Sequence, residues 1–306
     1  MYCRPRAQTR RGVEGSTTAD SVFAVPSLSG WASRGRPGLS ILEDMSFATH
    51  TDLARVQALA GRLADSARHT VRQYFRLPIA VEQKADLSPV TLADRAIETE
   101  MRRLIRAEFP THGIRGEEFP SEDGDEFTWV LDPIDGTKSF ITGFPLFGSL
   151  IALAQGTRPV FGVLEAPALG ERWVGCEGLP TLFNGAPVRT SNCQSIEQAR
   201  VYTTTIETFR GADRELFERA TGRAALRRYG GDCYLYGLLA SGFCDLVIEM
   251  SMKPHDYLAL VPVVEGAGGK MSDWSGAPLS TETGDKVLAA ATTELWEQAL
   301  ESLRPR

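Results

Sequence analysis

Two aspartates that stand three positions apart dominate the segment WVLDPIDGTKSF, residues 129–140. Asp132 and Asp135 follow a short apolar run of β-type residues, and Pro133 stiffens the space between them. Like charges held this close repel each other unless a cation lies between them. The carbonyl of Ile134 offers a third oxygen, and oxygen-only ligation suits a hard cation such as Mg²⁺. Metal ligation uses all of these groups, whereas helix capping or a surface turn uses only some of them.

The next two residues, Gly136 and Thr137, predict a turn that faces a phosphate. We expect a helix or helical turn to begin here, and exposed amides at a helix start bind phosphate. Glycine lets the backbone approach the anion closely, and the threonine hydroxyl can orient a water molecule. A DxxD pair alone would indicate little, because such pairs are common in turns. The whole string predicts a site where metal ions and phosphate meet.

The surrounding region is strongly acidic: between Arg115 and Lys138 the chain has eight carboxylates and no basic residue. Lys138 itself is equally compatible with attracting an anionic substrate and with ordinary solvation. For four of the acids we expect a solvated loop: Glu122, Asp123, Asp125 and Glu126. Another acid, Asp94, lies beside the apolar stripe of a predicted helix, where a carboxylate needs a partner.

The composition sets broad limits on fold and function. The 306 residues are 42% hydrophobic and 24% charged, which is typical of a globular chain with two domains or one layered unit. A net charge of −6 argues against a general nucleic-acid binder and suits an enzyme whose carboxylates hold cations. No apolar run approaches the ~18 residues of a membrane span. Five cysteines without CxxC spacing predict neither a disulfide framework nor a zinc site, so we expect a cytoplasmic protein.

Hydrophobic periodicity predicts alternating helices and strands, and therefore an α/β protein whose sheets are covered by helices. The expected helices span residues 52–76, 90–108, 213–221, 233–241, 256–267 and 294–303. The expected strands span residues 128–131, 148–154, 160–165, 172–175, 200–205, 244–249 and 287–291. Asn184 and Gly185 predict a hairpin turn between two further strands.

The chain is expected to have three parts. Residues 1–44 are rich in Arg, Ser and Gly and show no sustained period, which indicates a disordered tail or an over-long start with the true one at Met45. Residues 45–195 form an N-terminal α+β half with the metal and phosphate motifs. Residues 196–306 form a C-terminal α/β half that completes the site.

The chain resembles the inositol monophosphatase-like superfamily of magnesium-dependent, lithium-sensitive phosphatases. Three motifs occur in the order typical of that family: GEE at 116–118, DPIDGTKSF at 132–140 and HDYLALVPVVEGAGG at 255–269. The likeness runs from about Asp52 to the C-terminus. The resemblance implies a layered α-β-α-β-α fold, commonly a homodimer, that hydrolyses a small phosphate monoester with two or three Mg²⁺ ions per active site.

The resemblance also implies a ligand set. It places metal ligands at Glu117, Asp132, the Ile134 carbonyl, Asp135 and Asp256. In this pattern Asp132 bridges two ions, and Asp135 and Asp256 complete the second ion site.

The implied catalytic residues are Glu117, Thr137 and Asp94. Asp94 matches an acid that holds a further metal ion or its water, and Thr137 contacts the attacking water. The amides of Gly136 and Thr137 match the family's phosphate-binding groups, and Glu118 is expected to support Glu117 without binding metal. The implied reaction is in-line attack by water with no phosphoenzyme.

The substrate is expected to be histidinol phosphate. In the sugar-alcohol phosphatases of this superfamily a tryptophan usually precedes the last metal aspartate, but here His255 does. The segments 84–95 and 227–250 resemble the histidinol-phosphate phosphatase branch. A substrate with an ammonium and an imidazole needs acidic partners, and Asp232 and Glu249 are the candidates.

Each of these substrate assignments has an alternative. Asp232 could simply cap a helix, and His255 is expected to pack beside the site without binding metal, because its spacing to other histidines gives no metal pattern. Inositol phosphate is the second substrate candidate, ahead of sugar bisphosphates and phosphoadenosine phosphate. A protein of another class, an interaction partner with vestigial catalysis, has no physical need for mutually repelling acids.

Overall fold

The computed structural model describes residues 50–77 and 89–305, and all of them belong to one compact unit. The predicted tail at 1–44 and part of the segment 84–95 lie outside the described residues. No helix in the described part of the chain is long and apolar enough to cross a membrane.

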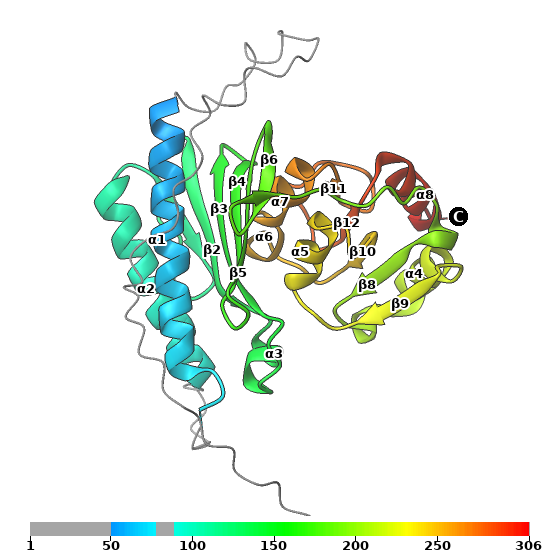
Figure 1. The fold of residues 1–306 in the computed structure, drawn as a ribbon, viewed down its shortest axis with the longest axis horizontal. Helices are drawn as coiled ribbons and strands as arrows, with labels where there is room; N and C mark the ends of the chain where they lie inside the picture. Colours follow the sequence, from blue (N-terminus) through cyan, green and yellow to red (C-terminus); the bar gives the residue numbers. More distant parts are fainter. Residues whose placement is uncertain (1–49, 78–88, 306) are drawn as a thin grey trace, which may run out of the picture. The chain divides into compact units, whose positions relative to one another are not determined.

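Two long helices, α1 (His50–Tyr74) and α2 (Pro89–Glu108), cover one face of the first sheet (Figure 1). Both were predicted from apolar residues that recur every three or four positions. These residues form the first hydrophobic core together with the inner face of the sheet. Its fully buried members include Leu59, Leu63, Ile97, Met101 and Trp129.

The first sheet has seven strands in sequence order, β1 to β7. Its strands are β1 (Gly113–Gly116), β2 (Phe127–Asp135), β3 (Gly148–Gln155), β4 (Arg158–Ala166), β5 (Glu171–Cys176), β6 (Leu179–Phe183) and β7 (Ala186–Pro187). β1 and β2 pair in parallel, and the other neighbours pair antiparallel. The predicted hairpin at Asn184 and Gly185 is confirmed: both have positive φ, 47° and 82°, as a two-residue β-turn requires.

Strand β2 corrects the expectation that the two aspartates follow a strand. The strand continues through both of them, and its pairing with β3 shifts register between Asp132 and Asp135. Pro133 lies within this irregular stretch, where its missing N–H costs no ladder hydrogen bond, and its carbonyl accepts a 2.6 Å bond from Ser149 Oγ. The two aspartates lie on either side of this irregularity.

The second sheet is formed by residues after 199, in the order β11-β12-β10-β8-β9. Its strands are β8 (Arg200–Thr203), β9 (Leu226–Tyr229), β10 (Leu246–Glu249), β11 (Lys270–Ser272) and β12 (Val287–Ala290). Helices α4 (Gly211–Thr221) and α8 (Thr293–Leu303) pack together, and a third hydrophobic core joins them to this sheet.

Three short helices lie between the two sheets: α5 (Tyr234–Ala240), α6 (Pro254–Tyr257) and α7 (Leu260–Gly266) (Figure 1). The prediction of one continuous helix over residues 256–267 is therefore wrong in one respect, because the segment forms two helices, α6 and α7. The break lies at Leu258 and Ala259. Pro262, in the first turn of α7, has no N–H to bond the carbonyl of Leu258, four residues earlier. The layers follow the predicted order α-β-α-β-α. The predicted boundary at 195 stays a prediction, although the two sheets lie on either side of it.

Two glycines let the central helices approach the first sheet closely. A Cβ at Gly162 of β4 would lie 2.0 Å from the carbonyl oxygen of Ala259. A Cβ at Gly175 of β5 would lie 2.3 Å from the backbone of Pro262. Any larger residue would push the helices away. Because α6 contacts β2 and β3, this close approach holds Asp256 near the end of β2.

Candidate functional site

The acids predicted to bind metal converge at the ends of β1 and β2. Asp132, Asp135 and Asp256 each offer an oxygen within 4.8 Å of the other two. Glu117, Asp132 and His255 form a second such group, which shares Asp132 with the first. Since β1 and β2 are parallel, their carboxyl ends meet at the same edge. The turn of α6 then brings Asp256 to that edge from the other half of the chain.

Two of the acids, Asp132 and Asp94, each have a buried oxygen without a hydrogen-bond partner among the described residues. Asp132 is 1% exposed and Asp94 is 5% exposed, and in each the buried Oδ1 has no hydrogen-bond partner among the described residues. Burial raises the pKa of Asp132 well above its usual range, and the charges of Asp135 and Glu117 raise it further. Burial also raises the pKa of Asp94 to about 8, with additions from Glu118 and Glu117.

The pKa of Asp135 is raised by the same causes as that of Asp132. Burial raises the pKa of Asp135, and the nearby charges of Asp256 and Asp232 add to the effect. One of its oxygens accepts a 2.6 Å bond from the Cys233 N–H. Carboxylates that are buried, close together and incompletely bonded fit a divalent cation, which would neutralise them all at once. Asp94 lies outside both three-residue groups, and it remains a candidate for holding water.

The loop that carries Glu117 is held by a buried ion pair on α2. Glu98 is fully buried, bonds Arg102 Nε at 2.8 Å and accepts the Glu118 N–H at 2.8 Å. Arg102 also bonds Glu122 at 2.6 Å, so the expectation of a purely solvated Glu122 is wrong. Sequence reasoning missed Glu98 and Arg102, although their i,i+4 spacing on α2 was a readable signal.

The turn after β2 has the predicted features of a phosphate-facing segment. Gly136 has φ 88°, a left-handed conformation that favours glycine, and a Cβ there would lie 2.8 Å from the Asp232 carboxylate. A short helix, α3 (Thr137–Ile141), begins directly afterwards. The Thr137 hydroxyl donates a long, 3.4 Å bond to the Ile134 carbonyl. The Ile134 carbonyl, predicted to bind metal, and the Thr137 hydroxyl, predicted to contact water, therefore lie next to each other.

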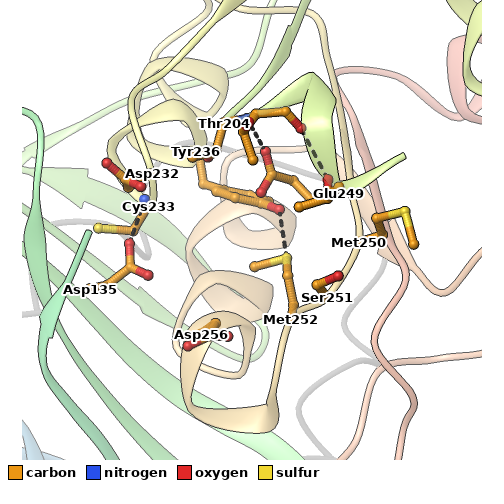
Figure 2. A pocket seen from close by; sticks show the side chains of 12 residues that line it. Asp135, Thr204, Asp232, Cys233, Tyr236, Glu249, Met250, Ser251, Met252 and Asp256 are labelled. Atoms are coloured by element: carbon orange, nitrogen blue, oxygen red, sulfur yellow. Dashed lines mark hydrogen bonds between the residues drawn. The ribbon is translucent and has the colours of Figure 1, made fainter. Parts of the chain in front are cut away.

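A cavity opens between this edge and the second sheet. Asp135 and Asp256 line it together with Asp232 and Glu249, so the structure brings all four predicted residues to one cavity (Figure 2). Sequence reasoning missed Tyr236, a buried lining residue whose hydroxyl lies 3.6 Å from the sulfur of Met252. Its position within an apolar helix gave no signal of a polar role.

Asp232 and Glu249 are anchored differently. Asp232 has φ 46°, and its Oδ2 accepts a 2.5 Å bond from Ser139 Oγ, so it bonds α3 and does not cap α5. Glu249 accepts a bond from the Thr203 hydroxyl at 3.2 Å. It also accepts a bond from the Thr204 N–H (Figure 2). Burial raises the pKa of Glu249 to about 7, and these bonds oppose the rise. Burial likewise raises the pKa of Asp232.

Comparison with known proteins gives the family. The model of the inositol monophosphatase family matches residues 52–305. The bifunctional phosphatase IMPL2, chloroplastic, of Arabidopsis thaliana is 44% identical over 88% of this chain and 80% of its own length. A histidinol-phosphatase of Chlorobaculum parvum is 38% identical over 71% of this chain and 85% of its own.

A solved structure of an inositol monophosphatase from Zymomonas mobilis is similar to this one. It superimposes with a TM-score of 0.78 and 43% identity, over 84% of this chain and 99% of that one. The match of the family model over most of the chain agrees with the layered fold and with the acids gathered at the end of β2. This chain therefore belongs to the inositol monophosphatase family and is a phosphoric monoester hydrolase.

Proposed function

We propose that this enzyme hydrolyses histidinol phosphate to histidinol and phosphate, a step of histidine biosynthesis. The observation that supports this most is a pair of acids, buried Glu249 and half-buried Asp232, in the cavity beside the acid cluster. The ammonium and imidazole of histidinol phosphate would find charge-assisted partners there. An inositol ring, which carries hydroxyl groups and no cation, gains less from these two carboxylates.

The name of a similar protein supports the same substrate. The Chlorobaculum parvum relative is named a histidinol-phosphatase, whereas the name of the Arabidopsis thaliana relative, a bifunctional phosphatase, gives no substrate. The similar Zymomonas mobilis structure, named an inositol monophosphatase, favours inositol phosphate as the second candidate. We place histidinol phosphate ahead of inositol phosphate because of the two acids in the cavity, Asp232 and Glu249.

The proposed cofactor is Mg²⁺, two or three ions per site. The residues that would hold it are Glu117, Asp132, the Ile134 carbonyl, Asp135 and Asp256. When bound, such ions make a coordinated water more acidic and offset negative charge on the phosphate and the leaving oxygen.

The chain's own groups position the reactants. The amides of Gly136 and Thr137 bind the phosphate oxygens, and the Thr137 hydroxyl, next to the Ile134 carbonyl, orients the attacking water. The free Oδ1 of Asp94 accepts a hydrogen bond from water on the same side. Glu249 and Asp232 hold the alcohol part of the ester in the cavity, which places the leaving oxygen opposite the water for in-line displacement.

Within this proposal the enzyme acts as a homodimer in the cytoplasm. The dimer follows from the family resemblance, and the compartment from the cysteine usage. Sedimentation of the full chain checks the first, and cell fractionation checks the second. A monomer with full activity would contradict the dimer.

The test is phosphate release from histidinol phosphate and from inositol 1-phosphate, measured side by side with and without Mg²⁺. We expect metal-dependent release with a clear preference for histidinol phosphate. Preference for inositol 1-phosphate would retain the metal chemistry and overturn the role of Asp232 and Glu249. No metal-dependent release from either ester would favour an interaction protein with vestigial catalysis.

A further inference from the structure

We propose that His255 supplies a nitrogen ligand to the ion held by Glu117 and Asp132. This site then binds a first-row transition dication such as Mn²⁺ more tightly than an all-oxygen site would. The inference rests on the proposed metal-dependent activity and extends it, because every ligand assigned so far is an oxygen.

The geometry around His255 is suited to a metal ligand. Its Nε2 is buried and has no hydrogen-bond partner among the described residues. This nitrogen lies 3.9 Å from Glu117 Oε1 and 3.4 Å from Asp256 Oδ1, and it shares a 4.8 Å group with Glu117 and Asp132. Atoms that each lie about 2.1 Å from one ion are separated from one another by roughly 3–4 Å. The 3.9 Å separation between His255 Nε2 and Glu117 Oε1 matches that spacing.

The short helix α6 delivers two different ligand atoms from neighbouring positions. His255 belongs to the group with Glu117, and Asp256 belongs to the group with Asp135. Both groups contain Asp132, so the nitrogen and the oxygen serve adjacent ions on either side of one carboxylate. Asp256 Oδ2 accepts a 2.7 Å bond from the Lys253 N–H, which fixes this turn and with it the direction of His255.

A packing role alone does not account for His255. A histidine that only fills space buries its ring and bonds both nitrogens, since an unpaired buried nitrogen costs free energy. Here the ring is largely covered, at 14% side-chain exposure, while the unbonded nitrogen points to the acids. Imidazole nitrogen discriminates between cations: Mg²⁺ favours oxygen, whereas later divalent metals accept nitrogen readily.

The decisive experiment is pulsed EPR on the full chain, stripped of metal and loaded with Mn²⁺ in the absence of substrate. We expect nitrogen coupling to the bound Mn²⁺, and its pattern should change when histidine is labelled with ¹⁵N. His255→Gln should remove the coupling. The matched control is His69→Gln, because His69 is exposed on α1 and bonds Gln73 instead, and this variant should retain the coupling.

Direct binding titrations give a second readout. In His255→Gln we expect the dissociation constant for Mn²⁺ to rise at least 10-fold and that for Mg²⁺ to change less than 3-fold. Bound Mn²⁺ without nitrogen coupling in the unmodified protein would overturn the role of His255 and leave the proposed function standing. Absence of Mn²⁺ binding altogether would overturn both. The EPR spectrum of the unmodified protein shows whether nitrogen binds Mn²⁺ even if the His255→Gln variant folds poorly.

Discussion

Two buried carboxylates in the first sheet, Glu165 in β4 and Asp132 in β2, have opposite surroundings. Glu165 is fully buried and bonds two guanidinium groups, those of Arg68 and Arg172. Asp132 is equally buried, but an oxygen of it is unbonded, and its charged neighbours are the carboxylates that raise its pKa. The same sheet thus contains one acid that is neutralised by the chain and one that is not.

The difference separates a structural acid from a functional one. A buried charge costs several kcal/mol unless it is paired, so folding alone favours an arrangement like that of Glu165. A cluster of acids that lacks cationic side chains is stable only when protonated or when a metal ion is bound. Glu249 lies between the two cases: it is buried and bonded, but only by the neutral donors of Thr203 and Thr204.

The largest expected effect comes from removing one of the structural partners. Arg172→Met leaves buried Glu165 with one cation fewer, and we expect the free energy of unfolding to fall by about 3–5 kcal/mol. Urea unfolding with a chelator present measures this. The matched control is Arg62→Met, which removes the exposed pair with Glu108 and should change stability far less. Similar losses in the two variants would remove the distinction between buried and exposed pairs.

The functional acids should respond in the opposite direction. Asp135→Asn removes one of the repelling charges, so the metal-free protein should unfold at the same or a higher temperature. Turnover should fall more than about 100-fold, because a direct ligand matters more than the outer groups whose loss costs 10–100-fold. The control is Asp123→Asn in the exposed acidic loop. A variant of Asp135 that remains active would contradict the metal assignment.

For a substitution of Glu249 we expect an effect of intermediate size on the free energy of unfolding, and this effect depends on pH. Its pKa rises from 4.5 in the unfolded chain to about 7 in the fold. A raised folded pKa contributes stability below pH 4.5, and that stability is lost as the pH rises through 7. The loss amounts to about 3 kcal/mol at most. We expect the unfolding free energy of metal-free Glu249→Gln to decline less between pH 5 and 8 than that of the unmodified protein. Parallel curves would show that the Thr203 and Thr204 bonds already offset the burial.

Much of this site was visible in the sequence because its central ligands are neighbours in the chain. Asp132, Ile134 and Asp135 occupy one short string, and the turn at Gly136 follows at once. The long helices α1 and α2 were also predictable, since each has enough turns for its apolar period to be clear. Strands β1 and β9 were not, because each has at most two apolar side chains, whereas β10 and β12, of the same length, are almost wholly apolar.

The contacts that complete the site join distant parts of the chain, and no local pattern predicts them. Ser139 bonds Asp232 across 93 positions, and the capping alternative for Asp232 looked nearly as good from the sequence. The register shift in β2 depends on the pairing with β3, which sequence periodicity does not fix. The unbonded nitrogen of His255 becomes informative only when Glu117 and Asp132 are seen beside it.

The smallest expected effect concerns the bond between Ser139 and Asp232. The Ser139 hydroxyl lowers the pKa of Asp232, which burial raises, so Ser139→Ala should favour the protonated acid. We expect KM for histidinol phosphate to rise about five-fold, the equivalent of about 1 kcal/mol for one hydrogen bond. KM for inositol 1-phosphate should not change, nor should either value in Thr142→Val, which removes a different hydroxyl just after α3. If Ser139→Ala raised both KM values equally, Ser139 would act on the phosphate turn. Asp232 would then be a structural acid like Glu165, and its bond to Ser139 would stabilise the fold without contributing to substrate binding.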